Sequence, residues 1–306
     1  MAQRHYKSVL VVGAGALGSR VIPMLAEGEF NRIGIADGDV VTKKNQISQP
    51  AYAPVDTSKV VHKSDFISYV LSSKYPAKEF VSYPFYIGEE RAKSAVRDYD
   101  MVIDLTDNLQ TRLVLNSACS MLSKPIVFAS IDENEGFFYT SSDGFACYNC
   151  IYRNSIGSPK EGCDSSIIKP TDAFLKGLVN AVTRMARGDS SQNGHLNYTS
   201  FVNGSRMEIN VAKDKACEIC SVHNYSSVPV SKFIQICGSG IKVSLQKNID
   251  LNAVEGRLSG YSIQSDNEYM LAHLDRKSVL ISAKGDLLFT GYTRQEAESL
   301  LVSLLG

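Results

Sequence analysis

A glycine-rich turn near the start of the chain is suited to holding a phosphate group. Gly13, Gly15 and Gly18 form the pattern G-x-G-x-x-G between a strand-like run and a helix-like run. Glycines permit a tight turn and a close approach of the backbone, and the helix N-terminus offers free N–H groups and a positive dipole. Asp37 lies 19 residues after Gly18, where a carboxylate can accept hydrogen bonds from ribose hydroxyls. These residues predict a nucleotide site, and they fit NAD as well as ATP.

A second polar group lies where another strand should end. Asp107 and Asn108 follow the strand-like run 101–105, and Arg112 comes about one helical turn later. Carboxylates at the carboxyl ends of parallel strands face the ligand, so Asp107 could hold Mg²⁺ on phosphates, while Lys59 could neutralise phosphate charge. The alternative is that Asp107 and Asn108 only cap the following helix, a position that both residue types favour.

Four of the seven cysteines form two C-x-x-C pairs, Cys147 with Cys150 and Cys217 with Cys220. Each pair can present two thiolates to one tetrahedral Zn²⁺, so the two pairs together predict a closed, structural four-sulfur site. Redox chemistry at one pair is the alternative. Neither pair opens a helix after a first strand, as the redox pair of a thioredoxin-like fold does, and this favours zinc.

The remaining cysteines divide into one candidate for chemistry and two candidates for the core. Cys163 lies in a polar stretch near Lys160 and Lys169, whose charges favour the thiolate form. It is therefore a candidate nucleophile or sulfur carrier, against the alternative of an inert loop cysteine. Cys119 lies in an amphipathic helix-like run and Cys237 in a strand-like run, so we expect both in the core.

These residues require a scaffold of alternating strands and helices. Strand-like runs occur at 8–12, 32–36, 80–87, 101–105 and 126–129, and helical spacing of apolar residues occurs at 17–26, 59–73 and 109–122. The alternation predicts an α/β fold with a Rossmann-like, mostly parallel sheet that has helices on both faces.

An antiparallel extension and a small second part follow. The Asn203-Gly204 turn between two strand-like runs predicts a hairpin, and the alternation of Met207 and Ile209 with polar residues predicts that one face of its second arm is buried. From Phe233 onward, short strands and a final helix predict an α+β subdomain. We therefore expect a zinc-stapled nucleotide-binding domain over 1–225 and a small subdomain over 226–306.

The overall charge excludes some partners. Lysine plus arginine equals aspartate plus glutamate at 32 each, so nothing draws the whole chain to nucleic acid or to a membrane. No apolar run approaches the roughly 20 residues that a membrane-spanning helix needs. The polar residues 1–7 lead directly into the first strand and leave no room for a signal peptide. We expect a cytoplasmic protein.

From about Ser8 to Cys220 the chain resembles the MoeB/ThiF branch of ubiquitin-activating-like enzymes. The resemblance rests on the glycine motif, the run Asp37–Val41, Thr106–Asn108 with Arg112, and the two cysteine pairs. It implies a homodimer that uses ATP and Mg²⁺ to adenylate the C-terminal glycine of a ubiquitin-like or sulfur-carrier β-grasp protein ending in Gly-Gly. It also implies an adenylation domain over 1–225. The carrier's carboxylate is already a nucleophile at neutral pH, so positioning and charge neutralisation supply the catalysis.

The resemblance also implies roles for single residues. Gly15 and Ala16 would lie against the phosphates, and Cys163 falls where many members carry a cysteine that forms a thioester or persulfide. The expected nucleotide-binding residues are Gly13, Gly15, Ala16, Gly18, Asp37, Asp39, Asn45, Lys59, Asp107 and Asn108, and the expected catalytic residues are Asp107, Lys59, Arg112 and Cys163.

Two cations of the family pattern are missing. Where the family reads Ser-Asn-Leu-x-Arg-Gln, this chain has Ser48 in place of the arginine, and Arg4 is too close to the first strand to match an arginine that often reaches a partner subunit. Lys43, Lys44 and Lys63 are candidate replacements. The departure keeps open a catalytically weak scaffold or partner subunit that binds a ubiquitin-like protein, and, as a further alternative, an NAD-dependent oxidoreductase.

Overall fold

The computed structural model describes residues 5–154, 169–225, 233–236, 240–245 and 247–305. These residues form two compact units. The first holds the described residues up to 225 except for 56–61. The second holds 56–61 and the described residues from 233 onward. The domain boundary expected near residue 226 stays a proposal, because residues 226–232 lie outside the described residues.

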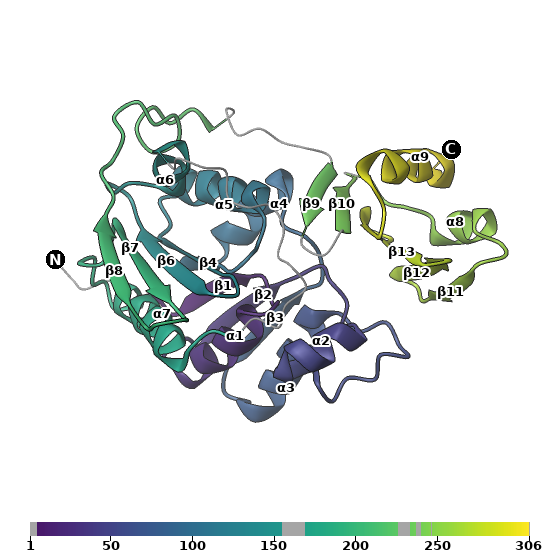
Figure 1. The fold of residues 1–306 in the computed structure, drawn as a ribbon, viewed down its shortest axis with the longest axis horizontal. Helices are drawn as coiled ribbons and strands as arrows, with labels where there is room; N and C mark the ends of the chain where they lie inside the picture. The colour runs from purple at the N-terminus through teal and green to yellow at the C-terminus, as the bar shows by residue number, and fades with distance from the viewer. Residues whose placement is uncertain (1–4, 155–168, 226–232, 237–239, 246, 306) are drawn as a thin grey trace. The chain divides into compact units, whose positions relative to one another are not determined.

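The first unit is built on an eight-stranded sheet of order β3-β2-β1-β4-β5-β6-β7-β8 (Figure 1). The first five strands in this order pair in parallel, and β6, β7 and β8 extend the sheet in antiparallel pairing. This confirms the predicted Rossmann-like sheet with an antiparallel extension. The strands are β1 (Ser8–Val12), β2 (Arg32–Ala36), β3 (Glu79–Tyr83), β4 (Met101–Asp104), β5 (Ile126–Ile131), β6 (Glu135–Ser141), β7 (His195–Ser200) and β8 (Arg206–Asn210).

Helices cover both faces of this sheet, as predicted. Figure 1 shows α1 (Gly18–Glu27) and α7 (Asp172–Ala186) on one side and α4 (Glu89–Arg97) and α5 (Leu109–Met121) on the other. The side chains of β1 alternate between these two layers, so four of its five residues are buried and it reads as a continuous apolar run. The remaining helical elements of this unit are α2 (Lys43–Ser48), the 3-10 turn η1 (Pro50–Tyr52), α3 (Lys63–Lys74) and α6 (Tyr148–Asn154).

Several element ends differ from the sequence-based expectation. The helix expected from residue 59 begins at Lys63, after His62 as N-cap, and the strand expected to reach Ile87 ends at Tyr83. The helix α4 was not predicted. Its buried side chains include the small residues Ala92 and Ala95, and most of its other residues are charged. Helical periodicity is weak where the buried stripe is made of alanine.

The predicted hairpin is present, but its second arm is not buried. β7 and β8 pair in antiparallel register around a turn in which Gly204 has a φ of +72°. Every residue of β8 is exposed, and Met207 and Ile209 remain 54% and 42% exposed. The expectation of a buried face is therefore wrong for the single chain, because β8, the last of the described strands in this sheet, has both of its faces exposed.

The second unit contains a six-stranded antiparallel sheet of order β11-β12-β13-β14-β10-β9. Val243, Phe289 and Leu301 are among the buried residues of its separate apolar core. The predicted final helix, α9 (Arg294–Leu305), has the expected ends. The other elements are β9 (Phe233–Ile236), β10 (Gly240–Ser244), α8 (Leu251–Arg257), β11 (Ser262–Ser265), β12 (Tyr269–Leu274), β13 (Lys277–Ser282) and β14 (Asp286–Thr290). Within the described ranges of both units, no helix combines the length and apolarity needed to cross a bilayer.

Candidate nucleotide site and metal centre

The glycine turn joins β1 to α1 and leaves room for only the smallest residue at two positions. Gly13 has a φ of +99°, and a Cβ atom there would lie 2.9 Å from the carbonyl carbon of Leu105. At Gly18 a Cβ atom would lie 2.0 Å from the carbonyl oxygen of Gly13. At Gly15, by contrast, a Cβ would meet no heavy atom of the described chain within 4 Å. The turn is therefore tight at its two ends and open in the middle, as close approach of a ligand requires.

Asp37, at the end of β2, is held against this turn by backbone amides. Its Oδ2 accepts a 2.7 Å hydrogen bond from the Ala14 N–H, and its Oδ1 accepts a 2.8 Å bond from the Asp39 N–H. Burial, assisted by the neighbouring charge of Asp39, raises the pKa of Asp37 to about 6, although Lys63 opposes the shift. Each carboxylate oxygen has a second lone pair, so Asp37 can still accept hydrogen bonds from a ribose.

Asp39 is occupied by two partners that the sequence did not assign to it. Lys63 Nζ donates to Asp39 Oδ2 at 2.8 Å, and the Tyr86 hydroxyl donates to Asp39 Oδ1 at 2.6 Å. The Lys63 side chain is only 7% exposed. Burial by itself would lower the pKa of Lys63, but the charges of Asp39 and Asp37 outweigh it, so the pKa is raised. A charged lysine is thus buried beside the acids at the strand ends.

The turn after β4 is organised by Asp104 and Arg112. Asp104 is fully buried and accepts hydrogen bonds from the Thr106 N–H at 2.9 Å and from the Thr106 hydroxyl at 2.6 Å. Burial raises the pKa of Asp104. Arg112 is also buried and donates to the Thr106 carbonyl, and its guanidinium lies 5.6 Å from the ring centroid of Phe137 and 5.7 Å from that of Tyr148. This geometry gives Arg112 a role in shaping the turn, and its assignment as a catalytic residue stays a prediction.

Of the two roles that the sequence left open for Asp107 and Asn108, the structure shows one, the capping of α5 by Asn108. Asn108 Oδ1 accepts a 2.7 Å bond from the Thr111 N–H and so caps α5. Asp107 is exposed beside it. Its charge contributes to the raised pKa of Lys63, which brings the two charges into one neighbourhood. The exposed carboxylate is suited to binding a cation, whereas the Asn108 side chain supports the helix.

The stretch between Val41 and Lys63 holds the other predicted phosphate contacts. Asn45 forms a capping box with Thr42 at the start of α2, in which Asn45 Oδ1 accepts from the Thr42 N–H at 2.9 Å. Lys59 lies in residues 56–61 of the second unit, so its assignment also stays a prediction. Sequence reasoning gave Lys63 only as a possible replacement. Lys63 is the first residue of α3 and lies opposite two acids. The sequence did not predict this position, because the helix was expected to start four residues earlier.

The four predicted metal ligands converge in the first unit. Their Sγ atoms all lie within 4.8 Å of one another, and all four cysteines are buried. Cys147 Sγ lies 3.6 Å from Cys217 Sγ, and Cys150 Sγ lies 3.5 Å from Cys220 Sγ. Tetrahedral zinc with Zn–S bonds of about 2.3 Å separates its sulfurs by about 3.8 Å, and four thiolates are a donor set that zinc prefers. The cluster fits a closed Zn²⁺ site.

Two asparagine amides support these sulfurs. Asn116 Nδ2 donates to Cys147 Sγ at 3.4 Å, and Asn149 Nδ2 donates to Cys217 Sγ at 3.5 Å. Asn116 Oδ1 also accepts from the Tyr148 N–H at 2.9 Å, so one side chain on α5 orients the start of the first cysteine pair. Such hydrogen bonds favour thiolates and fix their direction toward a metal.

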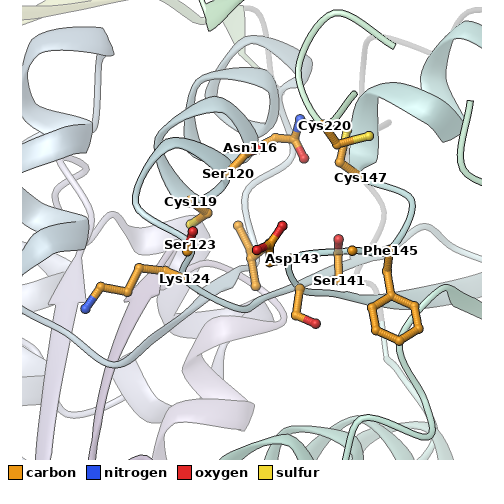
Figure 2. Close-up of a pocket in the computed structure, with 13 residues that line it drawn as sticks. Asn116, Cys119, Ser120, Ser123, Lys124, Ser141, Asp143, Phe145, Cys147 and Cys220 are labelled. Carbon is orange, nitrogen blue, oxygen red and sulfur yellow. Dashed lines mark hydrogen bonds between the residues drawn. The ribbon is translucent and has the colours of Figure 1, made fainter. Parts of the chain in front are cut away.

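A small polar cavity borders this cluster (Figure 2). Figure 2 shows Cys147 and Cys220 at one side of it and Asp143 and Lys124 among the other lining residues. Lys124 Nζ donates to the Tyr99 carbonyl at 2.6 Å and is therefore engaged. Cys119, also in the lining, is buried as predicted, and burial raises the pKa of its thiol, so it is not a reactive cysteine. Cys163 and Cys237 lie outside the described residues.

Comparison with known proteins gives a family match over most of the chain. A model described as the ThiF family matches residues 3–221. The adenylyltransferase and sulfurtransferase UBA4 of Kluyveromyces lactis is 35% identical over 163 residues, covering 51% of this chain and 36% of the relative. The adenylyltransferase and sulfurtransferase MOCS3 of Mus musculus is 35% identical over 181 residues, covering 59% and 38%. The chain thus spans little more than a third of the length of these two relatives.

A shorter relative matches more evenly, and solved structures share the fold. The sulfur carrier protein adenylyltransferase of Thermus thermophilus is 27% identical over 229 residues, covering 70% of this chain and 82% of the relative. The crystal structure of Escherichia coli MccB with ATP has a TM-score of 0.57 at 15% identity, covering 70% of this chain and 67% of that one. At this identity the likeness concerns the fold alone.

Proposed function

The chain belongs to the ThiF family, and from this premise we propose that it adenylates the C-terminal glycine of a ubiquitin-like or sulfur-carrier protein ending in Gly-Gly, using ATP. The observation that carries the proposal is the group of Asp37, Asp39 and buried Lys63 beside the open glycine turn. A relative named as a sulfur carrier protein adenylyltransferase supports the substrate class, and a second relative is named as an adenylyltransferase and sulfurtransferase. Membership of this family sets aside the NAD-dependent alternative that the glycine motif alone left open.

The reaction requires that two anions, the carrier's carboxylate and the triphosphate of ATP, be placed side by side. It does not require a dedicated base. In our proposal the carrier's terminal carboxylate attacks the α-phosphorus, and pyrophosphate leaves as the acyl-adenylate forms. The amides around Gly15 and Ala16 bind phosphate, Asp37 accepts from the ribose hydroxyls, and Lys63 supplies positive charge. Asp107 would hold Mg²⁺, which neutralises phosphate charge. Fixed charges in a partly desolvated site stabilise such a transition state more strongly than water does.

We assign zinc a structural role in this proposal. Four buried thiols leave no open ligand position, so the metal would join residues 147–150 to residues 217–220 without meeting the nucleotide. Cysteine pairs that bind a metal instead of forming disulfides are typical of a reducing compartment, and on this ground we propose a cytoplasmic location. A persulfide or thioester step at Cys163 remains part of the proposal. For the persulfide, the Cys163 thiolate would attack the outer sulfur of an external persulfide donor, and the donor's thiolate would leave. For the thioester, the thiolate would attack the acyl carbon of the adenylate, and AMP would leave.

The exposed apolar face of the hairpin is the surface that we propose for the carrier. Met207 pairs with Tyr198, which pairs with Phe137, and Gly136 pairs with Ile131 at the carboxyl end of β5. This row of side chains therefore lies next to the strand ends where the carrier's tail must arrive. An apolar face that one chain leaves open is typical of a partner-binding surface. Homodimerisation, implied by the family, is proposed alongside it.

Ser48 supports a second candidate, a partner subunit that binds a ubiquitin-like protein and adenylates it weakly. Carrier-dependent exchange of labelled pyrophosphate into ATP distinguishes the active adenylyltransferase from the weak partner subunit. We expect exchange with a glycine-ended carrier and none with the same carrier lacking its last glycine. The variant Asp107→Asn should lose most exchange, whereas Asp143→Asn, which changes an acid at the distant cavity, should keep it. Wild-type protein that binds ATP and carrier but shows no exchange would favour the weak partner subunit.

A further inference from the structure

Arg20 lies in the first turn of α1 and folds back over the glycine turn. Its Nη1 donates to the Ala16 carbonyl at 2.6 Å, and its Nη2 donates to the Ser48 carbonyl at 3.3 Å. The guanidinium thus connects the turn before α1 with the last residue of α2. Its side chain is partly buried, and burial lowers the pKa of Arg20, yet arginine remains charged in proteins.

This is an unfavourable place for a cation unless an anion joins it. The N-terminal end of a helix carries positive partial charge, so a guanidinium folded toward it opposes the helix dipole. The two carbonyls offset part of this cost, and the planar guanidinium has further N–H donors that these two bonds do not use. The open space over Gly15 lies in the same turn. A phosphate there would relieve the repulsion and could accept the remaining donors.

Ser48 supplies no such charge. Its hydroxyl donates to the Lys44 carbonyl at 2.9 Å within its own helix, while its carbonyl accepts from Arg20. The neutral side chain of Ser48 therefore bonds within α2, and the guanidinium of Arg20 reaches the Ser48 carbonyl from α1. The positive charge at this junction comes from Arg20.

We propose that Arg20 binds the triphosphate of ATP and supplies the cation that residue 48 lacks. The inference rests on the proposed function, because it assigns a further residue to the same ATP site. Arg20 does two things in this account. It fixes the distance between the glycine turn and the end of α2, and it directs its free N–H groups at phosphate oxygens.

The test compares binding of ATP and of adenosine by titration calorimetry. Arg20→Gln should weaken ATP binding about 10- to 100-fold, the range for a lost charge-assisted hydrogen bond, and change adenosine binding less than about twofold. Arg187→Gln is the matched control, since it removes a positive charge that pairs with Glu29 on the surface of the same unit. It should leave both affinities unchanged.

A second substitution separates charge from structure. Adding Ser48→Arg to Arg20→Gln should restore most of the ATP affinity, because it returns a guanidinium to the same junction. Equal weakening for ATP and adenosine, unchanged ATP binding, or no recovery in the double variant would overturn the proposal. If Arg20→Gln does not fold, Arg20→Lys replaces it, and it should weaken ATP severalfold while sparing adenosine. Wild-type protein that fails to bind ATP would refute the proposed function itself, whereas wild-type binding with an unaffected Arg20→Gln refutes only this inference.

Discussion

Replacing Lys63 by methionine tests the charge arrangement at the strand ends. The substitution keeps the length and most of the apolar volume of the side chain but removes the cation that donates to Asp39 at 2.8 Å. Breaking a buried ion pair by removing one partner costs about 3–5 kcal/mol, because the other charge stays behind without its counterion. Asp39 is 28% exposed and retains the hydroxyl of Tyr86, so part of this cost is relieved by water. We expect a loss of about 2–3 kcal/mol.

The assay is reversible unfolding of the nucleotide-free protein, followed by circular dichroism. A loss of 2–3 kcal/mol corresponds to a fall in Tm of about 5–10 °C for a domain of this size. The double variant Lys63→Met with Asp39→Asn removes the stranded carboxylate and should recover more than half of the lost stability. A Tm for Lys63→Met within about 1 °C of wild type, or a double variant no more stable than the single one, would refute the argument.

Three further predictions concern the metal, pH and the carrier. Elemental analysis should find one zinc per chain, which Cys217→Ser loses and Cys119→Ala retains; equal zinc in the two variants would exclude the four-sulfur site. ATP affinity should decline as pH falls through about 6, because burial raises the pKa of Asp37 and the protonated carboxyl accepts fewer hydrogen bonds from ribose; a binding constant that is flat between pH 5 and 8 would contradict this. Met207→Glu should raise the KM for the carrier about tenfold or more and leave the KM for ATP unchanged, since it adds charge to an apolar contact surface; unchanged carrier kinetics would place the carrier elsewhere.

The parallel sheet and the four-cysteine cluster could be predicted from sequence because their signals are local. Strands buried on both faces read as unbroken apolar runs, as Ser8–Val12 does, and the spacing within each cysteine pair matches the reach of one metal ion. Gly13 and Gly18 likewise follow from steric demands of one turn. In each case residues close together in the sequence carry the signal, although the two cysteine pairs themselves lie far apart in the chain.

The charged groups at the strand ends could not be predicted in the same way. Lys63 reaches the strand ends because α3 begins there and turns its first residue toward Asp39, 24 positions earlier in the chain. Arg20 meets Ser48 across 28 positions. Such contacts between distant residues depend on how helices pack, and the periodicity of a single sequence does not predict them. Asn45 and Asn108, which were assigned to nucleotide binding from the sequence, also stabilise helix starts: Asn108 is the N-cap of α5, and Asn45 is the third helical residue of a capping box whose N-cap is Thr42.

The open edge of β8 has a consequence for the behaviour of the purified protein. Among the described strands, β8 is the last of its sheet, and a terminal strand presents unpaired N–H and C=O groups. This strand alternates the apolar Met207 and Ile209 with the charged Arg206 and Glu208. Charges at such an edge discourage stacking of identical molecules into fibrillar β-structure. Neutralising Arg206 and Glu208 together should therefore make concentrated samples precipitate or form aggregates, while the folded monomer's stability changes little.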